Sequence, residues 1–269
     1  MPTSPLSPNL TRAVLNYLQV SPAAPDSVFL DALVAAYVRR VPWESVSRIV
    51  KRQRESDTAR CARWPQEFWQ DAMTQGTGGT CFETNYAFLA LLRALGFEGY
   101  LTINDMDLLT GCHSALVIMI GEQRWLVDVG LPLYVPVPLA ESDRSSRSSA
   151  FHTYRATPCG DCCYQIERDR HGRRYCYTLV DIPVSDSAYR AAVSADYGRS
   201  GLFLDRVIIT RVCEGRIWRF HSQQGVGVLE SFVNGGRTEH ALGSDPVATI
   251  AQRFQMTPAL IAAALAKAG

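Results

Sequence analysis

The chain has 269 residues, 47% hydrophobic and 20% charged, which is typical of a globular protein that buries a sizeable core. Its formal net charge of +1 gives no electrostatic basis for binding nucleic acid or an anionic membrane. No apolar run reaches the ~18 residues that a membrane-spanning helix needs, and residues 1–10 lack the pattern of a signal peptide. We therefore expect a cytoplasmic protein whose eight cysteines stay mostly reduced.

The first part of the chain is predicted to be helical. Apolar residues recur at helical spacing over 10–20, 27–39 and 64–73. Asp26 or Ser27 can cap the second of these helices. The charged segment 51–63 has only weak periodicity, so we expect it to form a solvated connector.

Beyond Gly96 the hydrophobic period changes from helical to alternating. Strands are predicted over 100–103, 113–120, 124–129, 164–167, 175–180, 207–212 and 217–220. Residues 142–149 read as a polar loop, and 246–254 and 258–266 read as two final helices. Helices, then a strand-rich middle and a mixed end, indicate an α+β fold rather than repeated βαβ units.

The rest of the chain is organised around the glycine-rich segment 76–85, GTGGTCFETN. Thr80 and Glu83 match the capping box that opens a helix, and the apolar run that follows closes at Gly96. Cys81 is then the first helical residue, where free backbone N–H groups and the helix dipole favour a thiolate, although Glu83 opposes it. A buried structural cysteine is the alternative interpretation.

A hairpin downstream supplies two groups that can serve this cysteine. Gly121-Glu122 is typical of a two-residue type II′ turn. Counting back from that turn sets Asp128 opposite Ala115, diagonal to His113 on the same face, with backbones about 7–8 Å apart. A three-residue turn would put Asp128 on the other face of its strand.

Cys81, His113 and Asp128 together have the chemistry of a nucleophile, its base and the group that fixes the imidazole tautomer. Each residue alone has a simpler explanation, since a histidine that opens an apolar strand is usually a satisfied core residue. The three in combination favour an enzyme with a thiol nucleophile.

These segments resemble the arylamine N-acetyltransferases, a branch of the cysteine-nucleophile group that includes transglutaminases and papain-like peptidases. Residues 40–46, RVPWESV, are similar to that family's R-x-P-F-E-N-L segment, and 77–85 resemble its R-G-G-x-C-x-E-x-N motif. His113 with its apolar strand, and 125–130, WLVDVG, resemble the segments that hold the family's His and Asp. Residues 200–203 before a strand also fit the family's third region.

The resemblance implies a helical bundle over 1–95, an antiparallel β-barrel over 96–190 and an α/β lid over 191–269. It also implies an acyltransferase in which Cys81 takes an acyl group from a thioester and passes it to a small amine. The co-substrate would be acyl-CoA, most simply acetyl-CoA, with no permanently bound cofactor; an acyl carrier protein would present the same thioester. Candidate substrate contacts are Trp43, Phe82, Gly130 and Leu131, although Trp43 also fits a core position.

Two departures from the family pattern bear on function. Thr77 stands where the family has the Arg expected to pair with the glutamate matching Glu44, so Glu44 needs another partner, with Arg40 or Arg48 as candidates. Gly130 is followed by Leu-Pro instead of Phe-Gly. Leucine lacks the flat face of an aromatic ring, so we expect simple arylamines to be poor acceptors.

A cluster of cysteines is a candidate metal site. Cys159, Cys162, Cys163 and Cys176, with His171 nearby, contain one C-x-x-C pair. A structural zinc ion needs four ligands, usually as two close pairs, and the second pair is missing. We therefore expect reduced cysteines and no metal.

Other functions can use the same residues. An amide synthase, or a transglutaminase- or peptidase-like enzyme, would keep the triad and change the chemistry. A non-catalytic binding module would explain the missing Arg at Thr77. The intact Cys81, His113 and Asp128 favour an enzyme.

Overall fold

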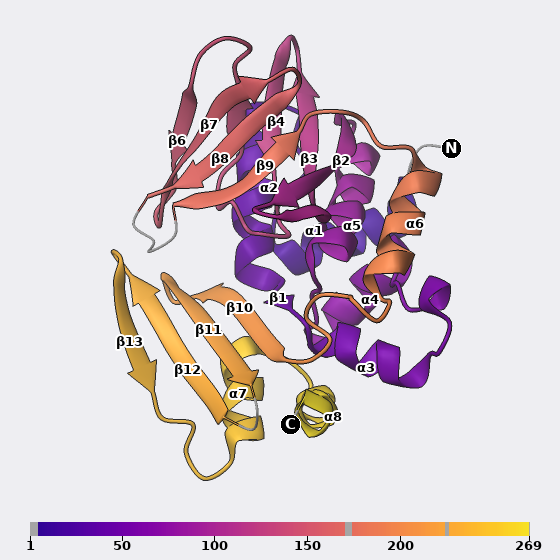
Figure 1. The fold of residues 1–269 in the computed structure, drawn as a ribbon, viewed down its shortest axis with the longest axis vertical. Coiled ribbons are helices and arrows are strands. Elements are labelled where there is room, and N and C mark those ends of the chain that lie inside the picture. Colours follow the sequence, from indigo (N-terminus) through magenta and orange to yellow (C-terminus); the bar gives the residue numbers. More distant parts are fainter. Residues whose placement is uncertain (1–4, 170–173, 224–225, 269) are drawn as a thin grey trace.

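The computed structural model describes residues 5–169, 174–223 and 226–268. Figure 1 shows three parts: N-terminal helices, an eight-stranded sheet above and in front of them, and a smaller sheet with two helices at the bottom. This arrangement confirms the predicted α+β class, with a helical bundle, an antiparallel barrel and an α/β lid.

The N-terminal part is built from helices of nine to fourteen residues. They are α1 (Pro8–Leu18), α2 (Ser27–Arg40), α3 (Val46–Arg54), α4 (Pro65–Gln75) and α5 (Cys81–Ala94), with a 3-10 turn at Thr58–Arg60. Asp26 caps α2 by accepting a 2.8 Å hydrogen bond from the Phe29 amide. Helix α5 is buried over most of its length and ends before Gly96, whose φ of 87° suits a residue without a side chain.

The eight-stranded sheet is antiparallel, in the order β5-β4-β3-β2-β9-β8-β7-β6. Its strands are β2 (Glu98–Met106), β3 (Leu109–Ile120), β4 (Gln123–Val127), β5 (Val137–Leu139), β6 (Ser145–Ser148), β7 (Thr153–Gly160), β8 (Cys163–Arg168) and β9 (Tyr175–Val180). Strand β5 also packs against β6 and β7, so the sheet nearly closes into a barrel. Strand β3 is buried on both faces: Ala115 and Val117 face the barrel interior, and Leu116 and Ile118 face the helices.

The smaller sheet has the order β1-β10-β11-β12-β13. Its strands are β1 (Trp43–Glu44), β10 (Val207–Cys213), β11 (Arg216–Gln223), β12 (Val226–Val233) and β13 (Gly236–His240). Helices α7 (Pro246–Phe254) and α8 (Pro258–Ala268) pack with it, and α3 packs against α8. Two elements from the N-terminal part, β1 and α3, therefore complete the C-terminal layer.

The structure differs from the sequence-based prediction in several segments, and strands β5, β7, β12 and β13 were not predicted. Residues 51–63 are not a solvated connector, because α3 continues to Arg54 and both Cys61 and Arg63 are buried. The predicted polar loop 142–149 contains β6, an edge strand without core residues that hydrophobic periodicity cannot reveal. Helix α6 (Asp186–Asp196) was not predicted, since it buries only Tyr189 and Val193.

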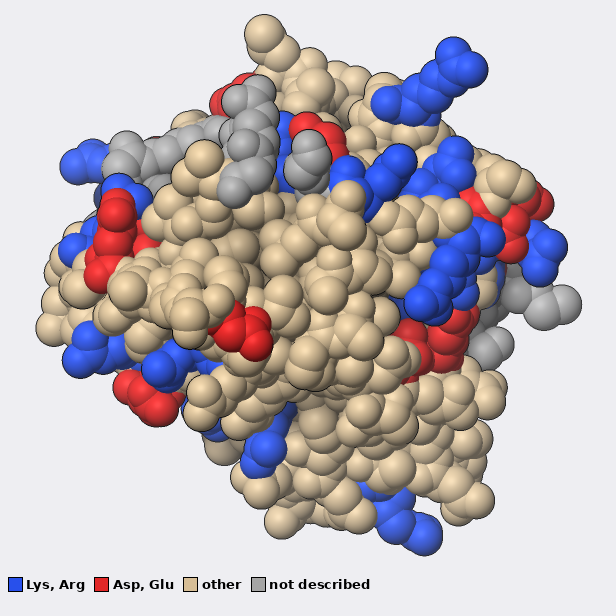
Figure 2. Space-filling view, turned by 90° about the horizontal axis from the view of Figure 1, so that it is seen from below, with Lys and Arg blue, Asp and Glu red and all other residues tan. Residues whose placement is uncertain are grey.

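The surface carries charges of both signs. On the face shown in Figure 2, basic and acidic side chains are interspersed among residues that are mostly uncharged. Across the described ranges, none of the helices combines the length and apolar character that crossing a bilayer demands.

Candidate active site

Cys81 opens helix α5 at the end of the glycine-rich loop. Thr80 is the N-cap residue with an extended backbone, but its side chain does not cap the helix. The Glu83 carboxylate is turned away, 2.7 Å from the Arg63 guanidinium and 2.6 Å from the Tyr197 hydroxyl. The helix begins at the residue that the sequence predicted. The predicted capping box is wrong, because Glu83 pairs with the buried Arg63 instead of the start of the helix.

The hairpin has the predicted two-residue turn, with Ile120 paired to Gln123 across it. Asp128 directly follows strand β4 and reaches back to strand β3. Its Oδ2 lies 2.7 Å from Nε2 of His113, and both side chains are almost fully buried.

Asp128 is held rigidly by three donors on its other oxygen. Oδ1 accepts hydrogen bonds from the Gly130 amide at 2.8 Å, the Leu131 amide at 2.9 Å and the Asn85 side chain at 3.1 Å. Oδ2 is left for His113. A carboxylate with this many donors keeps one orientation in a buried site.

Asn85 is a site residue that the sequence reasoning did not assign. Its amide group donates to the Ser114 carbonyl at 2.6 Å, and its oxygen accepts from the Val129 amide at 3.1 Å. It therefore ties the helix to both strands of the hairpin. The signal was present: Asn85 follows Cys81 by four residues, which puts both on one face of α5.

The electrostatics favour a protonated imidazole. Burial by itself would lower the pKa of His113, but the Asp128 carboxylate and the Cys81 thiolate raise it to about 10. With Nε2 facing Asp128, Nδ1 is the ring nitrogen left for the cysteine. The Tyr177 ring packs against the imidazole with centroids 4.5 Å apart and shields it from water.

Gly130 makes close contact with Cys81. A Cβ atom at this position would lie 2.4 Å from Cα of Cys81 and 2.7 Å from the Asn85 side-chain nitrogen. Only glycine fits there, because both distances are far below van der Waals contact. The loop after Asp128 is therefore packed directly on the start of α5.

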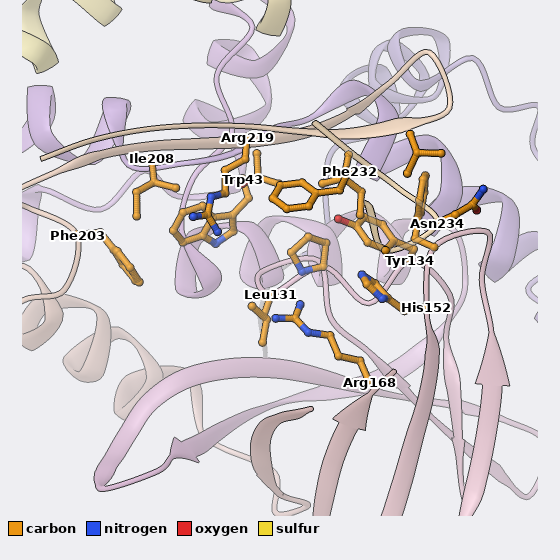
Figure 3. A pocket seen from close by; sticks show the side chains of 16 residues that line it. Trp43, Leu131, Tyr134, His152, Arg168, Phe203, Ile208, Arg219, Phe232 and Asn234 are labelled. Atoms are coloured by element: carbon orange, nitrogen blue, oxygen red, sulfur yellow. The ribbon is translucent and has the colours of Figure 1, made fainter. Parts of the chain in front are cut away.

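A cavity of about 250 Å³ lies between the barrel and the smaller sheet. Figure 3 shows Trp43, Leu131 and Phe203 on its walls, and Tyr134 and Phe232 farther along. The rings of Trp43 and Phe203 meet edge to face at 5.0 Å. Leu131 lines this cavity and directly follows Gly130, which packs against Cys81; Cys81 itself is not among the lining residues.

Comparison with known families agrees with this geometry. A family model described as N-acetyltransferase matches residues 28–223, a segment that contains the cysteine, the histidine and the aspartate. The chain belongs to this N-acetyltransferase family. No curated protein matches it.

Solved arylamine N-acetyltransferases share the fold at low sequence identity. The Mycobacterium marinum enzyme is 16% identical, with 96% of this chain and 100% of that one covered and a TM-score of 0.81. The Salmonella typhimurium enzyme is 18% identical, with 97% of this chain and 99% of that one covered and a TM-score of 0.80. A Bacillus cereus enzyme is described as having a Cys-His-Glu triad. It is 16% identical, with 93% of this chain and 100% of that one covered and a TM-score of 0.76.

Arg63 comes from a different segment and lies next to Thr77, the position where the resemblance led us to expect an arginine. The Arg63 guanidinium donates to the Thr77 hydroxyl at 3.2 Å and pairs with Glu83. Glu44 hydrogen-bonds to the Ser47 amide at 2.8 Å and the Gly78 amide at 3.1 Å. Burial raises the pKa of Glu44, and Arg63 is the main group that opposes this rise.

Neither of the expected partners of Glu44 is found. No hydrogen bond or ion pair joins Arg40 to it among the described residues, and Arg48 pairs with Asp196 at 2.8 Å. The prediction of Arg40 or Arg48 is wrong because it treated residues 51–63 as a connector outside the core.

The four candidate substrate contacts fall in different places. Trp43 and Leu131 line the cavity, and Gly130 lies behind it against Cys81. Phe82 is 1% exposed and packs against Tyr189, so it belongs to the core beneath the site.

Cys159, Cys162 and Cys163 lie at the β7–β8 turn, whereas Cys176 lies on β9 beside the far end of β8. Cys159 and Cys162 are exposed, Cys163 is half-buried and Cys176 is buried. Among the residues that the structure describes, no group of three or more potential ligands is placed to hold a metal ion. His171, the other residue considered, lies outside the described ranges.

Proposed function

We propose that this N-acetyltransferase works through an acyl-cysteine at Cys81. The observation that carries the proposal is the buried His113–Asp128 pair at 2.7 Å beside a cysteine that opens a helix. An imidazolium held by a carboxylate stabilises the neighbouring thiolate and supplies the proton that the leaving group needs.

The first half-reaction forms the acyl-enzyme. The Cys81 thiolate attacks the thioester carbonyl, the carbon–sulfur bond to CoA breaks, and the CoA thiolate leaves with the His113 proton. We propose that the backbone N–H of Cys81, at the start of α5, stabilises the oxyanion. Family membership supports acyl-CoA as the donor, and a structure of the M. marinum relative was solved in complex with CoA. We propose acetyl-CoA; nothing in the comparisons supports an acyl carrier protein.

The second half-reaction returns the enzyme to its starting state. An amine attacks the acyl-Cys81 carbonyl, His113 accepts the amine proton, and the Cys81 thiolate departs. Asp128 holds the imidazole in one tautomer through both halves. The cavity beside Leu131 is the proposed acceptor site.

The structure bears on which amines can enter. We expected poor use of arylamines because Leu131 replaces an aromatic residue. The same cavity is lined by the aromatic residues Trp43, Phe203 and Phe232, which offer flat surfaces to an arylamine. The expectation of poor arylamine use therefore depends only on the leucine at position 131. Comparing an arylamine with an alkylamine as acceptors of one acyl-enzyme tests it.

Intact-mass spectrometry tests the acyl-enzyme. Wild-type protein incubated with acetyl-CoA should gain the mass of one acetyl group, and the Cys81→Ala variant should gain none. Cys112→Ala, which removes the thiol next to His113, should still be acetylated. Acetylation of Cys81→Ala, or none of the wild type, would contradict the proposal.

A further inference from the structure

A second cavity, of about 760 Å³, lies on the opposite face of the smaller sheet from the cavity beside Leu131. Successive side chains of a strand point to opposite faces of its sheet. On β10, Thr210 lines the first cavity and Arg211 lines the second. On β11, Arg219 lines the first cavity and Trp218 lines the second. The second cavity is therefore a separate space, which α7 and the end of α2 border on its other side.

We call this second space the arginine cavity, because Arg39, Arg40, Arg211 and Arg253 line it. Glu214 is the single acid among its described lining residues, and it pairs with Arg253 at 3.3 Å. The other three arginines form no ion pair with a carboxylate within the described ranges. Positive charge is thus in excess around this cavity.

Arg211 is the most buried of these cations, with 7% of its surface exposed. Its guanidinium donates to the Arg39 carbonyl at 2.8 Å and to the Phe254 carbonyl at 2.6 Å, at the ends of α2 and α7. It also donates to the Gln255 side chain at 2.9 Å. Burial lowers the pKa of Arg211, and Arg40 acts in the same direction. The carbonyls fix this side chain and offset part of its charge, and an anion would offset the remainder.

The rim of the arginine cavity is also held in place. The Arg253 guanidinium lies 3.9 Å from the centre of the Trp218 ring, and the His240 ring packs against the same indole with centroids 4.5 Å apart. Stacking of this kind restricts the guanidinium to the cavity wall. The volume is within the range of about 300–1,000 Å³ that is usual for small-molecule sites, so there is room for more than a single ion.

We propose that the arginine cavity is a second ligand site, which binds a small molecule with two or more negative charges, a phosphate ester or a polycarboxylate. Guanidinium groups suit both, because their paired donors match the oxygens of phosphate and carboxylate groups. The inference goes beyond the proposed acyl transfer and does not depend on it, since Cys81, His113 and Asp128 are not among the residues that line this cavity. The competing explanation is that these arginines hold the phosphates of CoA.

The first test is calorimetric titration of the wild-type protein. Inorganic pyrophosphate and citrate are titrated separately, with sodium chloride used to keep the ionic strength constant. At least one probe should bind at one site per chain with a Kd below about 1 mM, and the tighter probe identifies the charged group that the cavity prefers. The titration needs no variant, so it remains valid even if a substitution impairs folding. Absence of saturable binding by both probes would overturn the inference.

Variants then assign the binding to the cavity. In the double variant Arg39→Met with Arg40→Met, the Kd of the probe should rise about tenfold or more. Neither side chain forms a hydrogen bond or ion pair with another described residue, so the fold should be kept. The double variant Arg54→Met with Arg144→Met is the control, because it removes two exposed arginines outside the cavity and gives the same net charge. Equal weakening in both double variants would attribute binding to overall charge and overturn the inference.

A titration in the presence of saturating CoA separates the competing explanation. Because the two cavities lie on opposite faces of the smaller sheet, the Kd of the probe should stay within about twofold. Loss of probe binding would assign the arginines to CoA instead. The Arg39→Met/Arg40→Met variant would then show a higher KM for acetyl-CoA but not for S-acetyl-N-acetylcysteamine, a thioester without phosphate. Absence of acetyl-Cys81 in the mass spectrum contradicts only the proposed function, so the two failures are distinguishable.

Discussion

Two buried polar clusters flank the first turn of helix α5, and they are built differently. The triad cluster consists of Cys81, Asn85, His113 and Asp128. The loop cluster consists of Arg63 with Glu44, Thr77, Glu83 and Tyr197. Both clusters bury charged side chains, and in each cluster the buried carboxylates accept several hydrogen bonds.

The clusters differ in whether a proton can move. The pKa of Arg63 lies above its usual range: burial alone would lower it, but Glu83 and Glu44 raise it further, so the charge is permanent. His113 is a group that can gain and lose its proton within the range of enzyme chemistry. The loop cluster holds the glycine loop in one shape, and under the proposed function the triad cluster next to it exchanges a proton with the substrate.

Asp128→Asn should have the largest effect on catalysis. Three donors fix Oδ1, so the new amide group would turn its N–H toward Nε2 of His113 and impose the wrong tautomer. We expect kcat/KM for acetyl transfer to fall by about four orders of magnitude, as in other triads, with a small change in melting temperature. Near-normal turnover would show that Asp128 does not position His113.

Arg63→Met should break the loop cluster and mainly reduce stability. It leaves Glu83 buried without its cation, which typically costs about 3–5 kcal/mol in the free energy of unfolding. Chemical denaturation measures the loss. Arg60→Met, which removes a side chain 73% exposed in the same segment, is the control and should stay close to wild type. Equal stabilities for the two variants would disprove the structural role of Arg63.

Gly130→Ala tests the contact between the loop and the nucleophile. The added methyl group would collide with the Cys81 backbone, so either the helix start or the loop must move. A displacement of about 1 Å at the reacting atoms can cost ~100-fold in rate, which single-turnover acetylation of Cys81 would detect. Gly236→Ala is a suitable control, because its nearest neighbour would be 3.3 Å away. Unchanged acetylation in Gly130→Ala would refute tight packing here.

The smallest expected effect is a pH dependence of stability. The pKa of His113 is about 10 in the folded protein and 6.5 in a free side chain. Because the folded value is higher, the stabilising contribution is complete below about pH 6.5 and is lost as pH rises toward 10. The stability difference between wild type and His113→Gln should therefore shrink as pH rises from 6.5 to 10. A difference that stays constant would mean that His113 is neutral in the folded state.

Local patterns predicted much of the site. The turn at Gly121-Glu122 determined the pairing of its two strands, and with it the meeting of His113 and Asp128. The end of α5 at Gly96 and the cap at Asp26 were likewise readable from short segments. Each of these features depends on residues close together in the chain, where backbone geometry leaves few alternatives.

Features that join distant segments could not be predicted. Arg63 pairs with a glutamate twenty positions away, from a segment whose charges suggested exposure. The cavity gathers Trp43, Leu131, Arg168 and Arg219 from four separate elements. The spacing of apolar side chains predicts which face of a helix or strand is buried, but it does not predict which residues pack against that face.

Strand β1 has a consequence for how this enzyme can evolve. It contains only Trp43 and Glu44, and the two side chains point in opposite directions, the indole into the cavity and the carboxylate to the Gly78 amide. The Glu44 amide also donates to the Gly79 carbonyl at 3.2 Å. A backbone shift that changes the position of Trp43 in the cavity would therefore also displace the glycine-rich loop that precedes Cys81. Under the proposed function, the range of acceptors and the alignment of Cys81 both depend on the backbone of β1. Substitutions on the opposite wall of the cavity would change the range of acceptors with less effect on the glycine-rich loop.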